Sequence, residues 1–141
     1  MARAWDGVIE NPLPGRLYKP RTTGVTMVLD KGCGVTALED LLSMASEYVD
    51  FWKITFGTSV TYPYYVLQSK LRILREHGVS ACPGGTLFEV AWMQGKYDAF
   101  LDRLQELGFT SIEISDGTYP LSIKERQEAI TKAKARKLEV L

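Results

Sequence analysis

The sequence is poor in the residues that build metal clusters and disulfide scaffolds. Its 141 residues include two cysteines, Cys33 and Cys82, and a single histidine, His77. Two cysteines so far apart predict free thiols rather than a ligand set or a disulfide framework. His77 falls at a predicted helix end, so no histidine is available to activate Cys33 as a nucleophile.

The sequence also lacks an excess of one charge and any long apolar run. Seventeen basic residues balance seventeen acidic ones, and the two halves of the chain are each balanced. This balance disfavours nucleic acid or an anionic membrane as a partner. Because no apolar run approaches the roughly 20 residues of a membrane span and no signal-like segment opens the chain, we expect a cytoplasmic protein.

A regular alternation of two patterns begins at Gly24. Short apolar runs that end in glycine or hydroxyl residues alternate with longer stretches of helical spacing. The runs predict strands at 25–29, 51–56, 79–82, 111–114 and 138–141. The longer stretches predict helices at 36–49, capped by Thr36 with Glu39, at 65–77, at 87–107 with a break near Gly95, and at 122–137, capped by Ser122.

This alternation predicts an α/β protein with a parallel sheet. A helix end that leads into a strand recurs at 74–79 and 104–109, and this spacing is one βα unit. The (β/α)8 TIM barrel and the open doubly wound sheet both fit, but Gly32-Cys33-Gly34 is only the first half of a dinucleotide fingerprint. We expect an irregular arm over 1–22 and the N-terminal half of a barrel over 23–141.

In parallel α/β folds the site lies at the carboxyl ends of the strands. Strand alternation places Lys53 and Thr55 opposite the apolar side chains Trp52, Ile54 and Phe56. It likewise places Glu113 and Ser115 opposite Ile112 and Ile114. Opposite charges that both point into a barrel suggest a catalytic pair, although a structural ion pair between Lys53 and Glu113 also fits.

Two loops of glycine and hydroxyl residues follow the second and third predicted strands. They contain Gly57, Thr58 and Ser59, and Gly84, Gly85 and Thr86. Backbone amides beside a hydroxyl suit a phosphate group, but the same residues also form ordinary turns. Asp30, just before Gly32, fits either a turn or a metal ligand.

Several segments together resemble the phosphosulfolactate synthase family. They are Lys19-Pro20-Arg21, Asp30-Lys31-Gly32, Tyr48-Val49-Asp50-Phe51 with Lys53, Phe56-Gly57-Thr58-Ser59, Gly84 to Glu89, and Ile112 to Thr118. The resemblance implies a (β/α)8 barrel that uses Mg²⁺ to add sulfite to phosphoenolpyruvate. The product is (2R)-2-phospho-3-sulfolactate, an intermediate in coenzyme M or sulfolactate biosynthesis.

The resemblance also suggests roles for the residues at the strand ends. Asp30 and Glu113 would bind Mg²⁺ or its waters, and Lys53 would act as a general acid or stabilise charge. Glu113 is thus assigned to both the metal and the catalytic pair with Lys53. The substrates phosphoenolpyruvate and sulfite would contact Thr55, Gly57, Thr58, Ser59, Gly84, Gly85, Thr86 and Ser115.

Length separates this sequence from a complete barrel, which needs about 250 residues. The pattern gives four βα units and the start of a fifth strand, so we expect an incomplete barrel or a homo-oligomer. One alternative is a noncatalytic synthase-like protein of the heat-stress type that acts by protein association. Another is a different phosphate-handling lyase or aldolase in which Lys53 forms a Schiff base.

Overall fold

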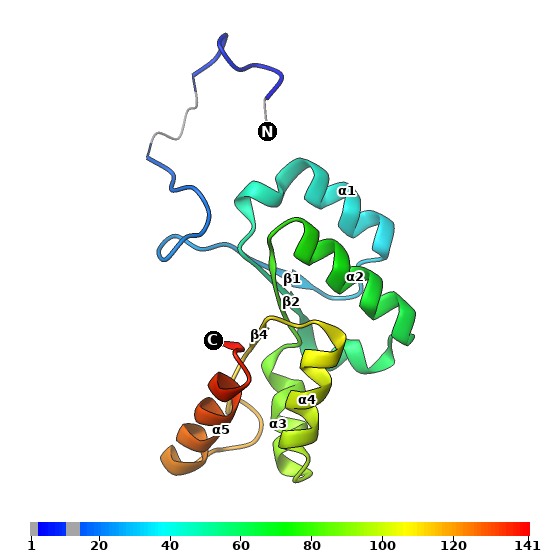
Figure 1. Ribbon diagram of the computed structural model, residues 1–141, viewed down its shortest axis with the longest axis vertical. Coiled ribbons are helices and arrows are strands. Elements are labelled where there is room, and N and C mark those ends of the chain that lie inside the picture. The colour runs from blue at the N-terminus through cyan, green and yellow to red at the C-terminus, as the bar shows by residue number, and fades with distance from the viewer. Residues whose placement is uncertain (1–2, 11–14) are drawn as a thin grey trace.

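The computed structural model describes residues 3–10 and 15–141 as alternating strands and helices (Figure 1). The elements in chain order are β1 (Met27–Asp30), α1 (Val35–Ala45), η1 (Ser46–Tyr48), β2 (Phe51–Ile54), η2 (Thr55–Thr61), α2 (Tyr64–Glu76), β3 (Ser80–Cys82), α3 (Gly85–Met93), α4 (Tyr97–Leu107), β4 (Ser111–Ile112), α5 (Ile123–Ala135) and β5 (Glu139–Val140).

All strand pairs are parallel. β1, β2 and β3 form one sheet in that order, in which Leu29 pairs with Lys53 and Lys53 with Cys82. β4 and β5 form a second, two-stranded sheet. Parallel strands joined by helical crossovers confirm the α/β class, and the arrangement is consistent with part of a TIM barrel.

A seam of one backbone and two side-chain hydrogen bonds joins the two sheets. The Ala81 N–H of β3 donates to the Thr110 hydroxyl at 2.9 Å, and the Thr110 N–H donates to the Ala81 carbonyl at 3.2 Å. The Ser111 hydroxyl also donates to that carbonyl, at 3.0 Å. β4 therefore lies beside β3 although the two strands form no regular ladder.

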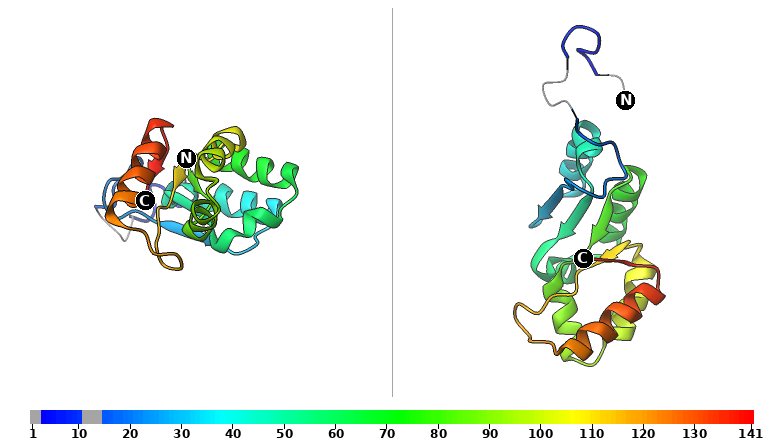
Figure 2. Two further views of the ribbon diagram at one scale, coloured as in Figure 1. Left: turned by 90° about the horizontal axis from the view of Figure 1, so that it is seen from below. Right: turned by 90° about the vertical axis from the view of Figure 1, so that its left-hand side faces the viewer.

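The two faces of the first sheet differ in burial. The apolar core includes Trp52 and Ile54 of β2 together with residues of α1 and α2, and Figure 2 shows these helices beside the sheet. On β1, Met27 and Leu29 alternate with the more buried residues and are 39% and 54% exposed. As predicted, Lys53 lies on the opposite face of β2 from the apolar pair.

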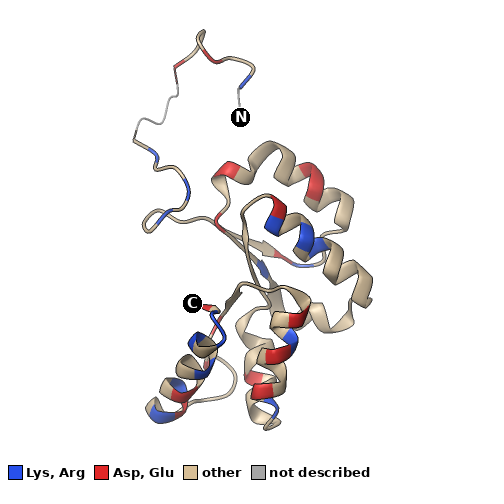
Figure 3. Ribbon diagram, viewed as in Figure 1, with Lys and Arg blue, Asp and Glu red and all other residues tan. Residues whose placement is uncertain are grey.

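Side-chain contacts connect α4 and α5, and Figure 3 shows basic and acidic residues on both helices. The buried hydroxyl of Tyr97 on α4 donates to the Ala129 carbonyl of α5 at 2.9 Å. Asp98 of α4 forms ion pairs with Lys132 at 2.8 Å and with Arg136 at 3.2 Å. These contacts attach the last helix to the preceding unit.

The predicted helix ends and strand lengths are partly wrong. α1 begins at Val35 after an extended Gly34, and no side chain caps it, so Thr36 lies inside the first turn. β2 ends at Ile54 because Phe56 and Gly57 adopt positive φ, and Phe56 is exposed instead of joining the apolar face. The predicted Ser122 cap of α5 is confirmed, and Glu125 completes a capping box with it.

The described parts of the predicted arm, 3–10 and 15–22, contain no helix or strand, and residues 1–2 and 11–14 lie outside the described residues. Arg21 anchors this segment, because its guanidinium pairs with Asp50 at 2.9 Å and both side chains are largely buried. Within 3–10 and 15–141, no helix is both long and apolar enough to span a membrane.

Candidate functional site

Lys53 and Glu113 lie together at the carboxyl ends of β2 and β4. The ammonium of Lys53 is 2.6 Å from Oε2 of Glu113, and the two side chains are 21% and 28% exposed. The same carboxylate oxygen accepts the Gly85 N–H at 2.6 Å. The structure thus brings this predicted pair together, partly exposed to solvent, at the N-terminus of α3.

The glycines before and at the start of α3 allow this close approach. A Cβ on Gly84 would lie 3.2 Å from the Ile54 carbonyl oxygen and 3.6 Å from Cε of Lys53, and its φ is +84°. A Cβ on Gly85 would overlap the Ser115 hydroxyl and lie 3.1 Å from Cδ of Glu113. Both positions need glycine because other parts of the site occupy the space of a side chain.

The Gly57-Thr58-Ser59 loop lies within η2, which packs against α3. Gly57 has a φ of +70°, and a Cβ there would touch Leu87 at 4.0 Å. The Thr58 hydroxyl is buried and has no hydrogen-bond partner among the described residues. The structure therefore places this loop beside the first turn of α3, which contains the half-buried Thr86.

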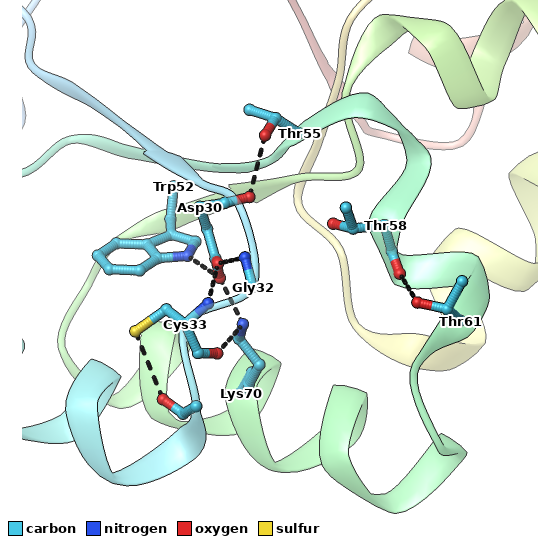
Figure 4. A network of polar contacts seen from close by, with 9 residues as sticks. Asp30, Gly32, Cys33, Trp52, Thr55, Thr58, Thr61 and Lys70 are labelled. Atoms are coloured by element: carbon cyan, nitrogen blue, oxygen red, sulfur yellow. Dashed lines mark hydrogen bonds and ion pairs between the residues drawn. The ribbon is translucent and has the colours of Figure 1, made fainter.

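Thr55 and Asp30 lie in the interior instead. The Thr55 hydroxyl donates to the Asp30 carbonyl at 3.0 Å, and its side chain is buried. Figure 4 shows the carboxylate of Asp30 between Trp52 and Lys70. Oδ1 accepts the N–H groups of Gly32 and Cys33, whereas Oδ2 accepts the indole N–H and pairs with Lys70.

The structure does not support Asp30 as a metal ligand. Its side chain is fully shielded from solvent, and each carboxylate oxygen already accepts two hydrogen bonds. Burial alone would raise the pKa of Asp30, but the hydrogen bonds from Lys70, Trp52 and the backbone lower it below its usual value. Asp30 is thus an ionised partner in a buried structural ion pair.

Among residues 3–10 and 15–141, no three histidine, cysteine, aspartate or glutamate side chains lie close enough to hold a metal ion together. Oε1 of Glu113 accepts no hydrogen bond from these residues, so it can act as a ligand. Magnesium is often bound by one or two carboxylates together with substrate phosphate oxygens. Glu113 fits one place in such a set.

Glu89 of α3 holds the loop that follows β4. Its carboxylate accepts the N–H groups of Gly117 at 3.2 Å, Thr118 at 2.7 Å and Tyr119 at 2.6 Å. It also accepts the hydroxyl of Ser115. The hydroxyl of Ser115, a predicted substrate ligand, therefore donates its hydrogen bond to Glu89.

Cys82 of β3 pairs with Lys53 of the neighbouring β2 and is completely buried. Burial raises the pKa of its thiol to about 11, although the Gly84 N–H opposes this shift. The thiol stays protonated near neutral pH, which excludes it as a nucleophile.

Sequence reasoning missed Lys70 and Glu89. Lys70 lies three residues after Leu67 and four before Leu74, so it falls on the apolar stripe of its helix. Glu89 falls in an apolar helix, one turn after Gly85. A charged residue on the apolar face of a helix can be recognised in the sequence. It indicates a buried ion pair or hydrogen-bond network, because a buried charge needs a partner.

Comparison with known proteins identifies similar chains. The family model described as (2R)-phospho-3-sulfolactate synthase (ComA) matches residues 14–141. A phosphosulfolactate synthase from Methanocaldococcus jannaschii is 42% identical over 125 residues, which cover 89% of this chain and 50% of that protein. The Methanothermobacter thermautotrophicus synthase is 39% identical over 120 residues, covering 85% and 46%.

The synthase from Bacillus subtilis is 39% identical over 114 residues, which cover 81% of this chain and 44% of that protein. The chain spans about half the length of the curated relatives it matches. All three relatives carry the synthase name, and this does not favour the noncatalytic alternative.

Proposed function

The chain belongs to the phosphosulfolactate synthase family, and we propose that it provides the Lys53–Glu113 pair for the addition of sulfite to phosphoenolpyruvate. The product would be (2R)-2-phospho-3-sulfolactate. The observation that carries this proposal is the contact between Lys53 and Glu113 at the strand ends, 2.6 Å long and partly exposed.

The reaction joins two anions without oxidation or reduction. The sulfur of sulfite would form a bond to the methylene carbon of phosphoenolpyruvate, and the electron pair of the double bond would move toward the carboxylate. A proton from the ammonium of Lys53 would then reach the carbon that bears the phosphate. Lys53 also offers positive charge where negative charge develops, which lowers the barrier.

Glu113 and the first turn of α3 would prepare Lys53 for this role. The carboxylate holds the ammonium in place through their 2.6 Å contact. The first N–H groups of a helix carry partial positive charge and suit phosphate or carboxylate groups. Because the Gly85 N–H already donates to Glu113, Thr86 and the adjoining Thr58 loop are the proposed substrate contacts. Mg²⁺, which would neutralise charge on the substrate, is proposed to contact Glu113.

A direct assay tests the activity. The purified protein is incubated with phosphoenolpyruvate, sulfite and Mg²⁺, and phosphorus NMR follows the loss of the enol phosphate and the appearance of a new phosphate ester. We expect Lys53→Met to lower turnover about a hundredfold or more. The matched control is Lys124→Met, because Lys124 is exposed on α5.

Because the chain spans about half of its relatives, the assay has a second arm. The protein is mixed with the separately expressed C-terminal half of the Methanocaldococcus jannaschii synthase. Absence of product in both arms would contradict the proposed activity. Equal turnover of the Lys53→Met protein and the wild type would remove Lys53 from the reaction.

Glu113→Gln tests the metal assignment separately. We expect this variant to need more Mg²⁺ for half-maximal turnover, because a neutral amide is a weaker ligand for a hard cation. An unchanged magnesium titration would show that Glu113 is not a ligand.

We also propose a cytoplasmic location and a homo-oligomeric state. The free thiols of Cys33 and Cys82 are typical of a reducing compartment. The exposed Met27 and Leu29 side chains on β1, an edge strand, suit burial against another copy. Production of sulfolactate or coenzyme M is the proposed biosynthetic role.

A further inference from the structure

Helix α3 contacts the β4 end of the site at two points. At its N-terminus the Gly85 N–H donates to Glu113, and one turn later Glu89 binds the loop at residues 115–119. Glu89 is not part of the Lys53–Glu113 pair, and the residue is only 4% exposed. A buried carboxylate in a largely apolar helix is costly unless its hydrogen bonds are satisfied.

The contacts of Glu89 are unusually complete for a side chain outside the reacting pair. Three consecutive backbone N–H groups, from Gly117, Thr118 and Tyr119, point to its two oxygens, and the hydroxyl of Ser115 adds a fourth donor. Residues 116–119 are themselves exposed. The carboxylate thus gives a fixed shape to a loop that has few buried contacts of its own.

We propose that Glu89 is a positioning residue of the site: by binding the 115–119 loop and Ser115, it fixes the end of β4 so that Glu113 meets Lys53. This inference rests on the proposed function. Ser115 and Glu113 are two residues apart and point to the same side of the chain, and both lie against Gly85. A shift of Ser115 would therefore move Glu113 away from Lys53.

We expect a neutral side chain at position 89 to bind the loop less well, because the contacts of Glu89 favour a charged carboxylate. Burial alone would raise the pKa of Glu89, but the hydrogen bonds from Ser115 and the three backbone N–H groups lower it below its usual value. Glutamine has the same shape, but its NH₂ group would face backbone N–H donors. At least one of the loop amides would lose its acceptor.

The test compares Glu89→Gln with Glu106→Gln, since Glu106 lies on the exposed surface of α4 in an ion pair with Arg103. We expect hydrogen exchange at the amides of residues 117–119 to become about tenfold faster in Glu89→Gln and to stay unchanged in the control. In the synthase assay, kcat should fall about tenfold while the KM for phosphoenolpyruvate changes less than threefold, because geometry rather than binding is lost.

Glu89→Asp provides a second variant in case the glutamine protein does not fold. It keeps the charge but is one methylene shorter, so both effects should be smaller and in the same direction. Unchanged exchange at residues 117–119 in a folded variant would overturn the proposal, whether or not the protein is active. Faster exchange with an unchanged kcat would also overturn it, whereas an inactive wild-type protein would contradict only the proposed function.

Discussion

Lys70 of α2 forms an ion pair with Asp30 of β1, and both side chains are completely shielded from solvent. The ammonium also donates to the Cys33 carbonyl at 2.7 Å and lies 4.8 Å from the centre of the Tyr62 ring. One buried cation thus connects the end of the first strand, the loop after it and the second helix. The pair lies on the helix-packed face of the sheet, opposite Lys53.

We predict that Lys70→Met destabilises the protein by about 3–5 kcal/mol, because it leaves the Asp30 carboxylate buried without a counter-charge. The free energy of unfolding is measured in urea. The control, Arg72→Met, breaks an exposed pair with Glu76 and should cost about 0.3–0.5 kcal/mol. The double variant Asp30→Asn/Lys70→Met should recover at least about 1 kcal/mol; no recovery would show that the charge of Asp30 is not the cause.

Stability should depend on pH through Asp30. Its pKa in the folded protein lies below the unfolded value of 3.8, so its contribution is complete above that pH and is lost as the pH falls through the folded pKa. We expect the stability difference between the wild type and Asp30→Asn to be constant from pH 7 to about 5 and then to shrink. A difference that persists unchanged to pH 2.5 would contradict this assignment.

Gly84 should tolerate alanine less well than Gly95. Both glycines have positive φ, but only Gly84 has a backbone oxygen, that of Ile54, 3.2 Å from the position of a Cβ. We expect Gly95→Ala to cost about 1–2 kcal/mol for its backbone conformation alone and Gly84→Ala to cost more. Thermal unfolding measures both losses of stability. Equal losses would show that β2 shifts to accommodate the added methyl group without strain.

The two cysteines should differ in reactivity. Cys82 is buried with a pKa raised to about 11, whereas Cys33 is partly exposed, although burial also raises the pKa of its thiol. Iodoacetamide at pH 8 should therefore label Cys33 slowly and leave Cys82 unmodified in the native protein. Both should react in urea, as measured by mass spectrometry of peptides. Rapid native labelling of Cys82 would indicate that β3 opens.

The strand and helix order could be predicted from the sequence because the apolar spacing changes between two periods along the chain. The common location of Lys53 and Glu113 was also predictable. On each of their two strands the charged residue alternates with apolar residues, so its side chain must point to the opposite face from theirs. The outcome for Asp30 was not predictable from local sequence. Its environment depends on Lys70, forty residues away, and on the indole of Trp52 on the neighbouring strand.

The start of α1 at Val35 shows a second limit of prediction from the sequence. Thr36 and Glu39 have the spacing of a capping box, yet the N-cap is Gly34 in extended backbone, two residues before Thr36. The same pattern at Ser122 and Glu125 does form a capping box. Local pattern alone does not distinguish the two cases, because the path of the loop from β1, held by Asp30, decides where α1 begins.

The seam between β3 and β4 gives one side chain a role that backbone normally has in a sheet. At Ala81 the hydroxyl of Thr110 is the acceptor for an N–H that a regular ladder would pair with a carbonyl. A ladder can be loosened only by moving the chain, whereas a hydroxyl can be exchanged by a single substitution. A substitution at Thr110, which lies outside both strands, would therefore remove the acceptor for the Ala81 N–H and leave only the backbone bond from the Thr110 N–H and the Ser111 hydroxyl to tie the Ala81 carbonyl to the fourth strand.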